Sequence, residues 1–107
     1  MMADSLWREI AGEPRPLGTR CTECTRTAFP PASRCRFCGS RNVNQVELSA
    51  HAIVEAVSLM GTVLVVHART TDGVVLLGQA EPAGLVRVGH AVRFRPTGHH
   101  MRFELDE

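Results

Sequence analysis

The apolar and polar positions divide the chain into a short apolar start, a middle with almost no hydrophobic periodicity, and a second half of β-like runs. In the first segment, residues 1–16, apolar side chains recur at helical spacing between a capping residue and helix-ending residues. These are Leu6, Trp7 and Ile10, preceded by Asp4 and followed by Gly12 and Pro14. We predict a short helix there, which must pack on this domain or on a partner because two turns are marginal alone in water.

The last segment, residues 46–107, is rich in Val, Leu, Ala and Gly and has turn residues at short intervals. Such a pattern is typical of an all-β barrel, and we predict five strands. They lie within Leu48–Met60, Val63–Thr70, Val74–Ala80, His90–Arg95 and Met101–Leu105. The first run does not alternate strictly, which indicates a bend or bulge. The pair Asp72-Gly73 predicts a tight hairpin between the second and third strands.

The middle segment, residues 17–45, is rich in Arg, Thr, Pro and Cys, so a conventional apolar core cannot order it. It holds all four cysteines of the chain in two Cys-x-x-Cys pairs. These are Cys21 and Cys24, then Cys35 and Cys38. Two-residue spacing lets each pair point both sulfurs at one centre, which predicts a structural zinc ion with no open coordination position. A rubredoxin-like iron and paired redox cysteines or disulfides are the alternatives.

Charge and composition exclude several kinds of chemistry. All 12 basic residues are arginine and tyrosine is absent, so neither a lysine Schiff base nor a tyrosyl group can act. The formal net charge is +1, and a zinc ion held by four thiolates would add two negative charges, which is poor for nonspecific DNA binding. The sequence contains no GxSxG elbow, HExxH helix, Walker loop or GxGxxG fingerprint, and no run of eighteen apolar residues. We therefore expect a cytoplasmic protein with no membrane contact and no catalytic residues.

Three residues outside the cysteines are candidate contacts. Arg34 and Arg36 flank Cys35 and could bind a phosphate or a partner, or could simply be solvated. Trp7 could anchor a partner, because tryptophan is favoured at interface hot spots. Nucleic acid is an unlikely ligand, since the aromatic residues of the barrel segment, Phe94 and Phe103, are predicted to face inward and cannot stack on bases.

The order of these parts resembles a known family. The matching stretches are Arg20-Cys21-x-x-Cys24, Phe29-Pro30-Pro31, Cys35-x-x-Cys38-Gly39-Ser40, Glu47-Leu48-Ser49 and Val88-Gly89-x-x-Val92-x-Phe94. The chain is similar to the OB-fold family with an N-terminal rubredoxin-like zinc ribbon, whose members accompany thiolases and related acyl-CoA enzymes. The resemblance implies an all-β fold: the short N-terminal helix of 1–16, a zinc ribbon at 17–45, and a five-stranded OB-fold barrel at 46–107.

The resemblance also implies a function. Family members are non-catalytic subunits that dock on a thiolase-like or ketosynthase-like enzyme and help form its acyl-CoA or acyl-substrate site. The alternative that the sequence leaves open is a nucleic-acid-binding ribbon and barrel. This chain departs from the family pattern in two places: Thr25 stands where the first knuckle usually ends in glycine, and the stretch around Gly61 is shorter than usual.

Overall fold

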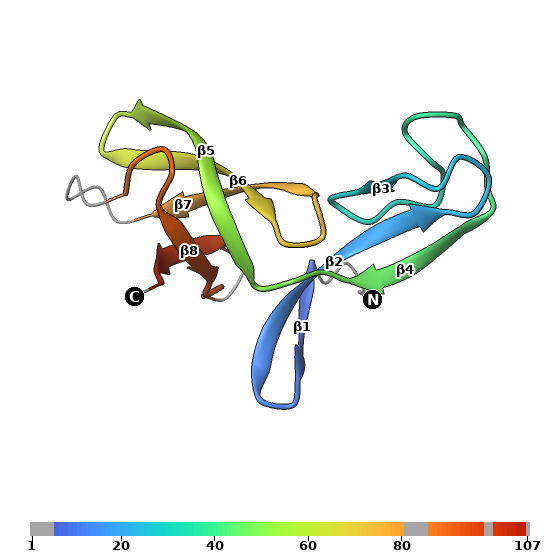
Figure 1. Cartoon of the computed structure of the whole chain (residues 1–107), viewed down its shortest axis with the longest axis horizontal. Coiled ribbons are helices and arrows are strands. Elements are labelled where there is room, and N and C mark those ends of the chain that lie inside the picture. The colour runs from blue at the N-terminus through green and yellow to red at the C-terminus, as the bar shows by residue number, and fades with distance from the viewer. Residues whose placement is uncertain (1–5, 81–85, 98–99, 107) are drawn as a thin grey trace. The chain divides into compact units, whose positions relative to one another are not determined.

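The computed structural model describes residues 6–80, 86–97 and 100–106, and in this part of the chain all regular structure is β. The chain divides into two compact units, Met1–Leu48 and Ser49–Glu107 (Figure 1). The first unit contains β1 (Trp7–Ile10), β2 (Glu13–Cys21), β3 (Thr27–Ala28) and β4 (Val43–Glu47). The second contains β5 (His51–Met60), β6 (Val63–Thr70), β7 (Val75–Ala80), β8 (Ala91–Phe94) and β9 (Arg102–Leu105).

The helix predicted for residues 1–16 is wrong for its described part, which forms an antiparallel hairpin of β1 and β2. Ala11 and Gly12 make the two-residue turn, with φ angles of 53° and 83°. Positive φ at both positions is the geometry that matches the twist of two paired strands. A glycine after a helix and a glycine in this hairpin turn both take positive φ, so Gly12 alone does not distinguish the two elements. Pro14 and Pro16 also favour the strand, because proline lacks the N–H that a helix interior needs.

Strand β2 is the centre of the first unit. Its first half pairs with β1, and Leu17 to Cys21 pair with β4, so one strand runs from the hairpin into the cysteine-rich ribbon (Figure 1). β3 pairs with β2 at Thr19 and Arg20. This approach needs Gly18, since a Cβ there would lie 2.7 Å from the carbonyl oxygen of Ala28. The ribbon therefore depends on a glycine at a position where no turn requires one.

The second unit is a closed five-stranded barrel with the order β5-β6-β7-β9-β8, which confirms the barrel prediction. All its pairs are antiparallel except β7–β9. The register of β5 shifts between Val54 and Ala56, which is the irregularity that the broken alternation predicted. Gly73 has a φ of 87° in the turn between β6 and β7, and the Asp72 carboxylate accepts a hydrogen bond from the amide of Ser49 at 2.8 Å.

Two phenylalanines fill the barrel interior. Phe94 is 0% exposed and Phe103 is 3% exposed, and their rings meet edge to face with centroids 6.1 Å apart. Gly78 on β7 faces this pair, and a Cβ at that position would lie 2.5 Å from the Phe103 ring. The inward phenylalanines of the sequence prediction are therefore confirmed, and they are closed off from any base-stacking role. Within the described ranges, no helix could span a membrane.

Candidate metal centre

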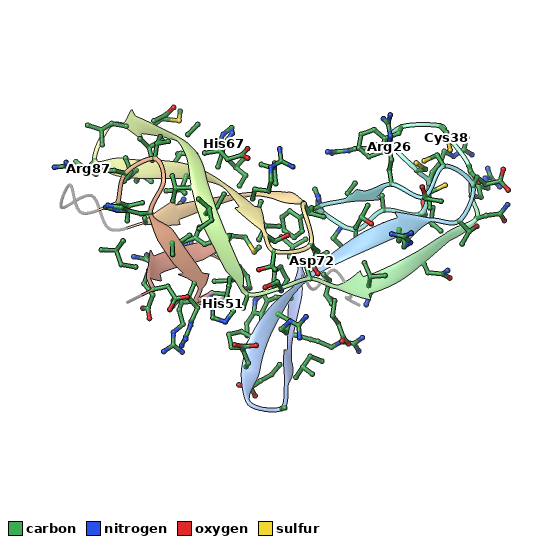
Figure 2. The ribbon with its side chains drawn as sticks, in the orientation of Figure 1. Arg26, Cys38, His51, His67, Asp72 and Arg87 are labelled. Carbon is green, nitrogen blue, oxygen red and sulfur yellow. The ribbon has the colours of Figure 1, made fainter. Side chains whose placement is uncertain are left out.

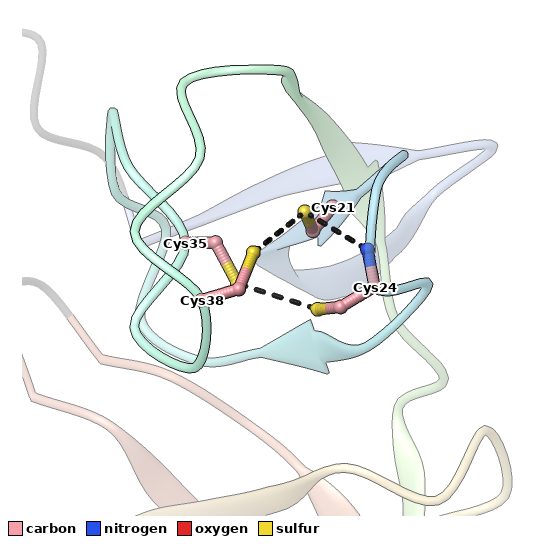
Figure 3. A group of neighbouring side chains, drawn as sticks. All are labelled: Cys21, Cys24, Cys35 and Cys38. Atoms are coloured by element: carbon pink, nitrogen blue, oxygen red, sulfur yellow. Dashed lines mark hydrogen bonds between the residues drawn. The ribbon is translucent and has the colours of Figure 1, made fainter.

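The four cysteines of the ribbon converge from two loops. Cys21 ends β2, Cys24 follows in the first knuckle, and Cys35 and Cys38 form the second knuckle before β4. Figure 3 shows the four side chains pointing at a common centre. Their sulfur atoms all lie within 4.8 Å of one another. The Cys21 and Cys38 sulfurs are 3.6 Å apart, as are those of Cys24 and Cys35, and all four cysteines are free of disulfides.

These distances fit a tetrahedral zinc ion. Zinc–thiolate bonds of about 2.3 Å place the sulfurs of a regular tetrahedron about 3.8 Å apart, close to what the ribbon provides. Four thiolates fill every position of such an ion, so its role is structural and it cannot activate a substrate as a Lewis acid. The zinc predicted from the cysteine spacing is therefore supported by the geometry of the donor set.

Backbone amides prepare both knuckles for thiolates. The amides of Glu23 and Cys24 approach the Cys21 sulfur at 3.3 and 3.5 Å, and the amide of Phe37 approaches the Cys35 sulfur at 3.3 Å. Hydrogen bonds to the charged form of a thiol favour it. The pKa of Cys35 is accordingly lowered to about 6, chiefly by the backbone amide of Cys38, and the pKa of Cys21 is lowered chiefly by that of Cys24. The Ser40 amide acts in the same direction on Cys38, but burial and the neighbouring thiols raise the pKa of Cys38 to about 12.

Thr25 completes the first knuckle in an unusual conformation. Its φ is 64°, in the left-handed region that favours glycine, while Gly39 takes a φ of 80° after the second knuckle. Both knuckles are therefore followed by a residue with positive φ, which is glycine in one and β-branched threonine in the other. Thr25 thus keeps a positive φ although it stands where the family usually has glycine, and a β-branched residue is strained in this conformation.

A cavity of about 150 Å³ lies in the same unit and brings three arginines together. Arg34 and Arg36, the two candidates from the sequence, both line it, and so does Arg26. Figure 2 labels Arg26 in the ribbon, and its guanidinium lies 5.0 Å from the centroid of the Phe37 ring. Sequence reasoning did not single out Arg26 from the other arginines of the ribbon. The available signal was its position two residues after Cys24, where the fold of the knuckles returns the chain toward Arg34 and Arg36.

The third candidate, Trp7, lies on β1 and is half-buried. It pairs in register with Pro16 on β2, so it belongs to the hairpin that leads into the metal site. A partly exposed indole remains accessible for a partner contact, which stays a prediction.

Several polar contacts on the barrel surface link neighbouring strands. The Arg69 guanidinium donates to Glu55 at 2.5 Å, and the Arg95 guanidinium donates to Glu104 at 3.0 Å. His51, labelled in Figure 2, lies 2.7 Å from a carboxylate oxygen of Asp106. In the part of the chain that the structure describes, the cysteines are the one cluster with metal-binding geometry.

Comparison with known proteins agrees with this architecture. Residues 8–44 match the family model described as ChsH2, rubredoxin-like zinc ribbon domain. No curated protein matches the chain in sequence. A solved protein of unknown function from the DUF35 family of Sulfolobus solfataricus shares the fold with a TM-score of 0.70 and 24% identity, over 86% of this chain and 76% of that chain.

A second solved structure, the Ltp2–ChsH2(DUF35) aldolase, contains a chain that aligns with a TM-score of 0.62 and 19% identity. The alignment covers 85% of this chain and 84% of that chain. At these identities the two structures show the fold alone. Together with the family model they support the resemblance seen in the sequence, a rubredoxin-like zinc ribbon followed by a barrel.

Proposed function

We propose that this chain, which carries a rubredoxin-like zinc ribbon of the ChsH2 kind in residues 8–44, is a non-catalytic accessory subunit. It docks on a thiolase-like or ketosynthase-like enzyme and helps form the site for that enzyme's acyl-CoA or acyl substrate. The observation that carries this proposal is the closed four-cysteine centre, which can order the ribbon but leaves no coordination position for a substrate. The bond-making residues then belong to the partner.

The family context supports an assembly rather than a protein that acts alone. One solved relative in fold is named as the pair of Ltp2 with ChsH2(DUF35), and that pair is called an aldolase. The barrel of this chain has the strand order of an OB-fold, in which a three-stranded meander is closed by a parallel pair of strands. We assign it to that class, in agreement with the family resemblance of the sequence.

The nucleic-acid alternative is less well supported. Single-stranded nucleic acid needs several aromatic side chains on which bases stack, along a continuous basic track. The barrel phenylalanines are buried, and the exposed Phe37 of the ribbon already has Arg26 over its ring. Trp7 and Phe29 are half-buried, so the described part of the chain offers no row of exposed rings for a polymer.

The experiment that tests the proposal is an affinity purification of the tagged chain from its native cell extract. The bound proteins are identified by mass spectrometry, and the complex is reconstituted from purified components. We expect a thiolase-like or ketosynthase-like enzyme in fixed ratio. Its turnover of acyl-CoA substrates should fall when this chain is removed, while the chain alone turns over none.

Two results would contradict the proposal. Acyl-CoA turnover by the isolated chain would make it an enzyme in its own right. Retention on single-stranded DNA that weakens steeply with salt, with no enzyme bound, would favour the nucleic-acid alternative, because polymer contacts through several arginines release counterions.

A further inference from the structure

The arginine-lined cavity of the zinc ribbon has no ligand among the roles assigned so far. We propose that it is a docking pocket for an acidic segment of a protein partner, in which one carboxylate binds between Arg26, Arg34 and Arg36. The inference rests on the proposed docking to a partner enzyme and specifies the chemistry of one contact. The residues that carry it all belong to the first unit.

The three arginines bring unpaired positive charge to one place. Within the described part of the chain, none of Arg26, Arg34 and Arg36 makes an ion pair, although arginines elsewhere do so with Glu47, Glu55 and Glu104. No acidic residue is among the described residues that line the cavity. Arginine presents a planar fork of donors that matches a carboxylate in two parallel hydrogen bonds. The pocket therefore has the donors for a carboxylate and lacks the acceptor.

The walls of the cavity complement an apolar neighbour of that carboxylate. Pro30 and Pro31 line the cavity together with Phe37, a residue that is 49% exposed. A volume of about 150 Å³ is suited to one side chain and not to an extended polymer. In a partner segment, an acidic residue would pair with the arginines, and an apolar residue next to it would pack against the prolines and the phenylalanine.

The local charge favours a single carboxylate over a phosphate chain. Cys21 and Cys35 also line the cavity, so the zinc centre, which carries a charge of −2 with four thiolates, lies against it. Three arginines beside that centre leave the region with a charge of only +1. Such a charge is balanced by one carboxylate, whereas a diphosphate carries more negative charge than the region can neutralise.

The test uses the zinc-loaded full chain and does not need the partner enzyme, so its failure is distinguishable from failure of the proposed function. The probe is a capped pentapeptide with one glutamate between two leucines, titrated while backbone amide and arginine side-chain N–H signals are followed by NMR. We expect saturable shifts of the Arg26, Arg34 and Arg36 signals. The matching peptide with glutamine in place of glutamate should bind at least about tenfold more weakly, since it loses the charge-assisted pair.

A matched pair of double variants separates the pocket from general charge. R34Q/R36Q removes two cavity arginines, and R20Q/R41Q removes two exposed arginines of the same unit that do not line the cavity. R34Q/R36Q should weaken binding of the glutamate peptide about tenfold or more, whereas R20Q/R41Q should weaken it less than about twofold. An equal loss in both variants would overturn the proposal, because diffuse charge would then explain the binding.

Competing ligands test the class of partner. Inorganic phosphate and a single-stranded thymidine oligonucleotide are titrated against the same signals. If either binds the cavity arginines more tightly than the glutamate peptide does, the pocket is a phosphate site and the proposal is wrong. Weaker binding of both, with the peptide response intact, supports a carboxylate-bearing protein segment.

Discussion

Thr25 holds a φ of 64° in the first knuckle, and the equivalent turn after the second knuckle uses Gly39. A left-handed conformation costs an L-residue about 1–2 kcal/mol, and glycine avoids this cost. Glycine is in turn more flexible in the unfolded chain, which costs about 0.5–1 kcal/mol. Thr25→Gly should therefore stabilise the zinc-loaded ribbon by about 0.5–1 kcal/mol.

The threonine hydroxyl does not change this balance. Its Oγ1 donates to the carbonyl oxygen of Cys24 at 2.6 Å, but Thr25 is exposed, so water replaces the bond when the side chain is removed. The matched control is Thr27→Gly on β3. Thr27 has no positive φ, so glycine there gives no relief and should destabilise the ribbon by about 1 kcal/mol.

The assay is urea unfolding at a buffered free zinc concentration, followed by the fluorescence of Trp7. This residue is the only tryptophan of the chain and lies on β1, which pairs with the strand that ends at Cys21. With a slope of about 2 kcal/mol/M, the Thr25→Gly midpoint should rise by about 0.3–0.5 M. An unchanged or lower midpoint, with the expected loss in Thr27→Gly, would refute the reasoning that Thr25 is strained.

Three further predictions follow from the metal centre, the barrel interior and the hairpin. Removing zinc with a chelator should unfold residues 17–44 before the barrel, and a metal-free chain with unchanged amide NMR signals in that range would contradict this. Gly78→Ala should destabilise the barrel by about 1–3 kcal/mol in thermal unfolding, because the new Cβ would overlap the Phe103 ring. The exposed control Leu77→Ala should change the stability of the barrel by less than about 0.5 kcal/mol. Equal losses of stability in the two variants would show that the barrel has room for a side chain at Gly78. Ala11→Asn should slightly raise the urea midpoint measured by Trp7 fluorescence, because asparagine tolerates the positive φ of the hairpin turn better than alanine does. A lower midpoint would argue against that turn.

The barrel was predictable because its signals are local. The Asp72-Gly73 turn and the broken alternation of the first strand each depend on a few neighbouring residues, and each has a counterpart in the structure. The cysteine spacing was informative for the same reason, since two-residue knuckles can present sulfurs to a metal in few ways. In each case the residues that form the pattern are also the residues that form the turn, the bulge or the metal site, and they are close together in the chain.

The N-terminal segment and the arginine cavity were harder for a different reason. At Gly12 a helix end and a hairpin turn require the same positive φ, and the choice depends on pairing with β2, which a local pattern does not contain. Arg26 joins Arg34 and Arg36 only through the folding of two knuckles around the metal. Contacts between residues distant in sequence leave no periodicity that could reveal them.

The closure of the barrel restricts how any other protein can recognise this half of the chain. Each of the five strands pairs with a neighbour on both sides, so none presents a whole edge to which a foreign strand could add. Outward side chains such as Ile53 and Leu77, which are 49% and 53% exposed, are available for recognition instead. Such positions can be substituted without disturbing the interior, so a barrel of this kind can change its specificity during evolution while its backbone stays the same.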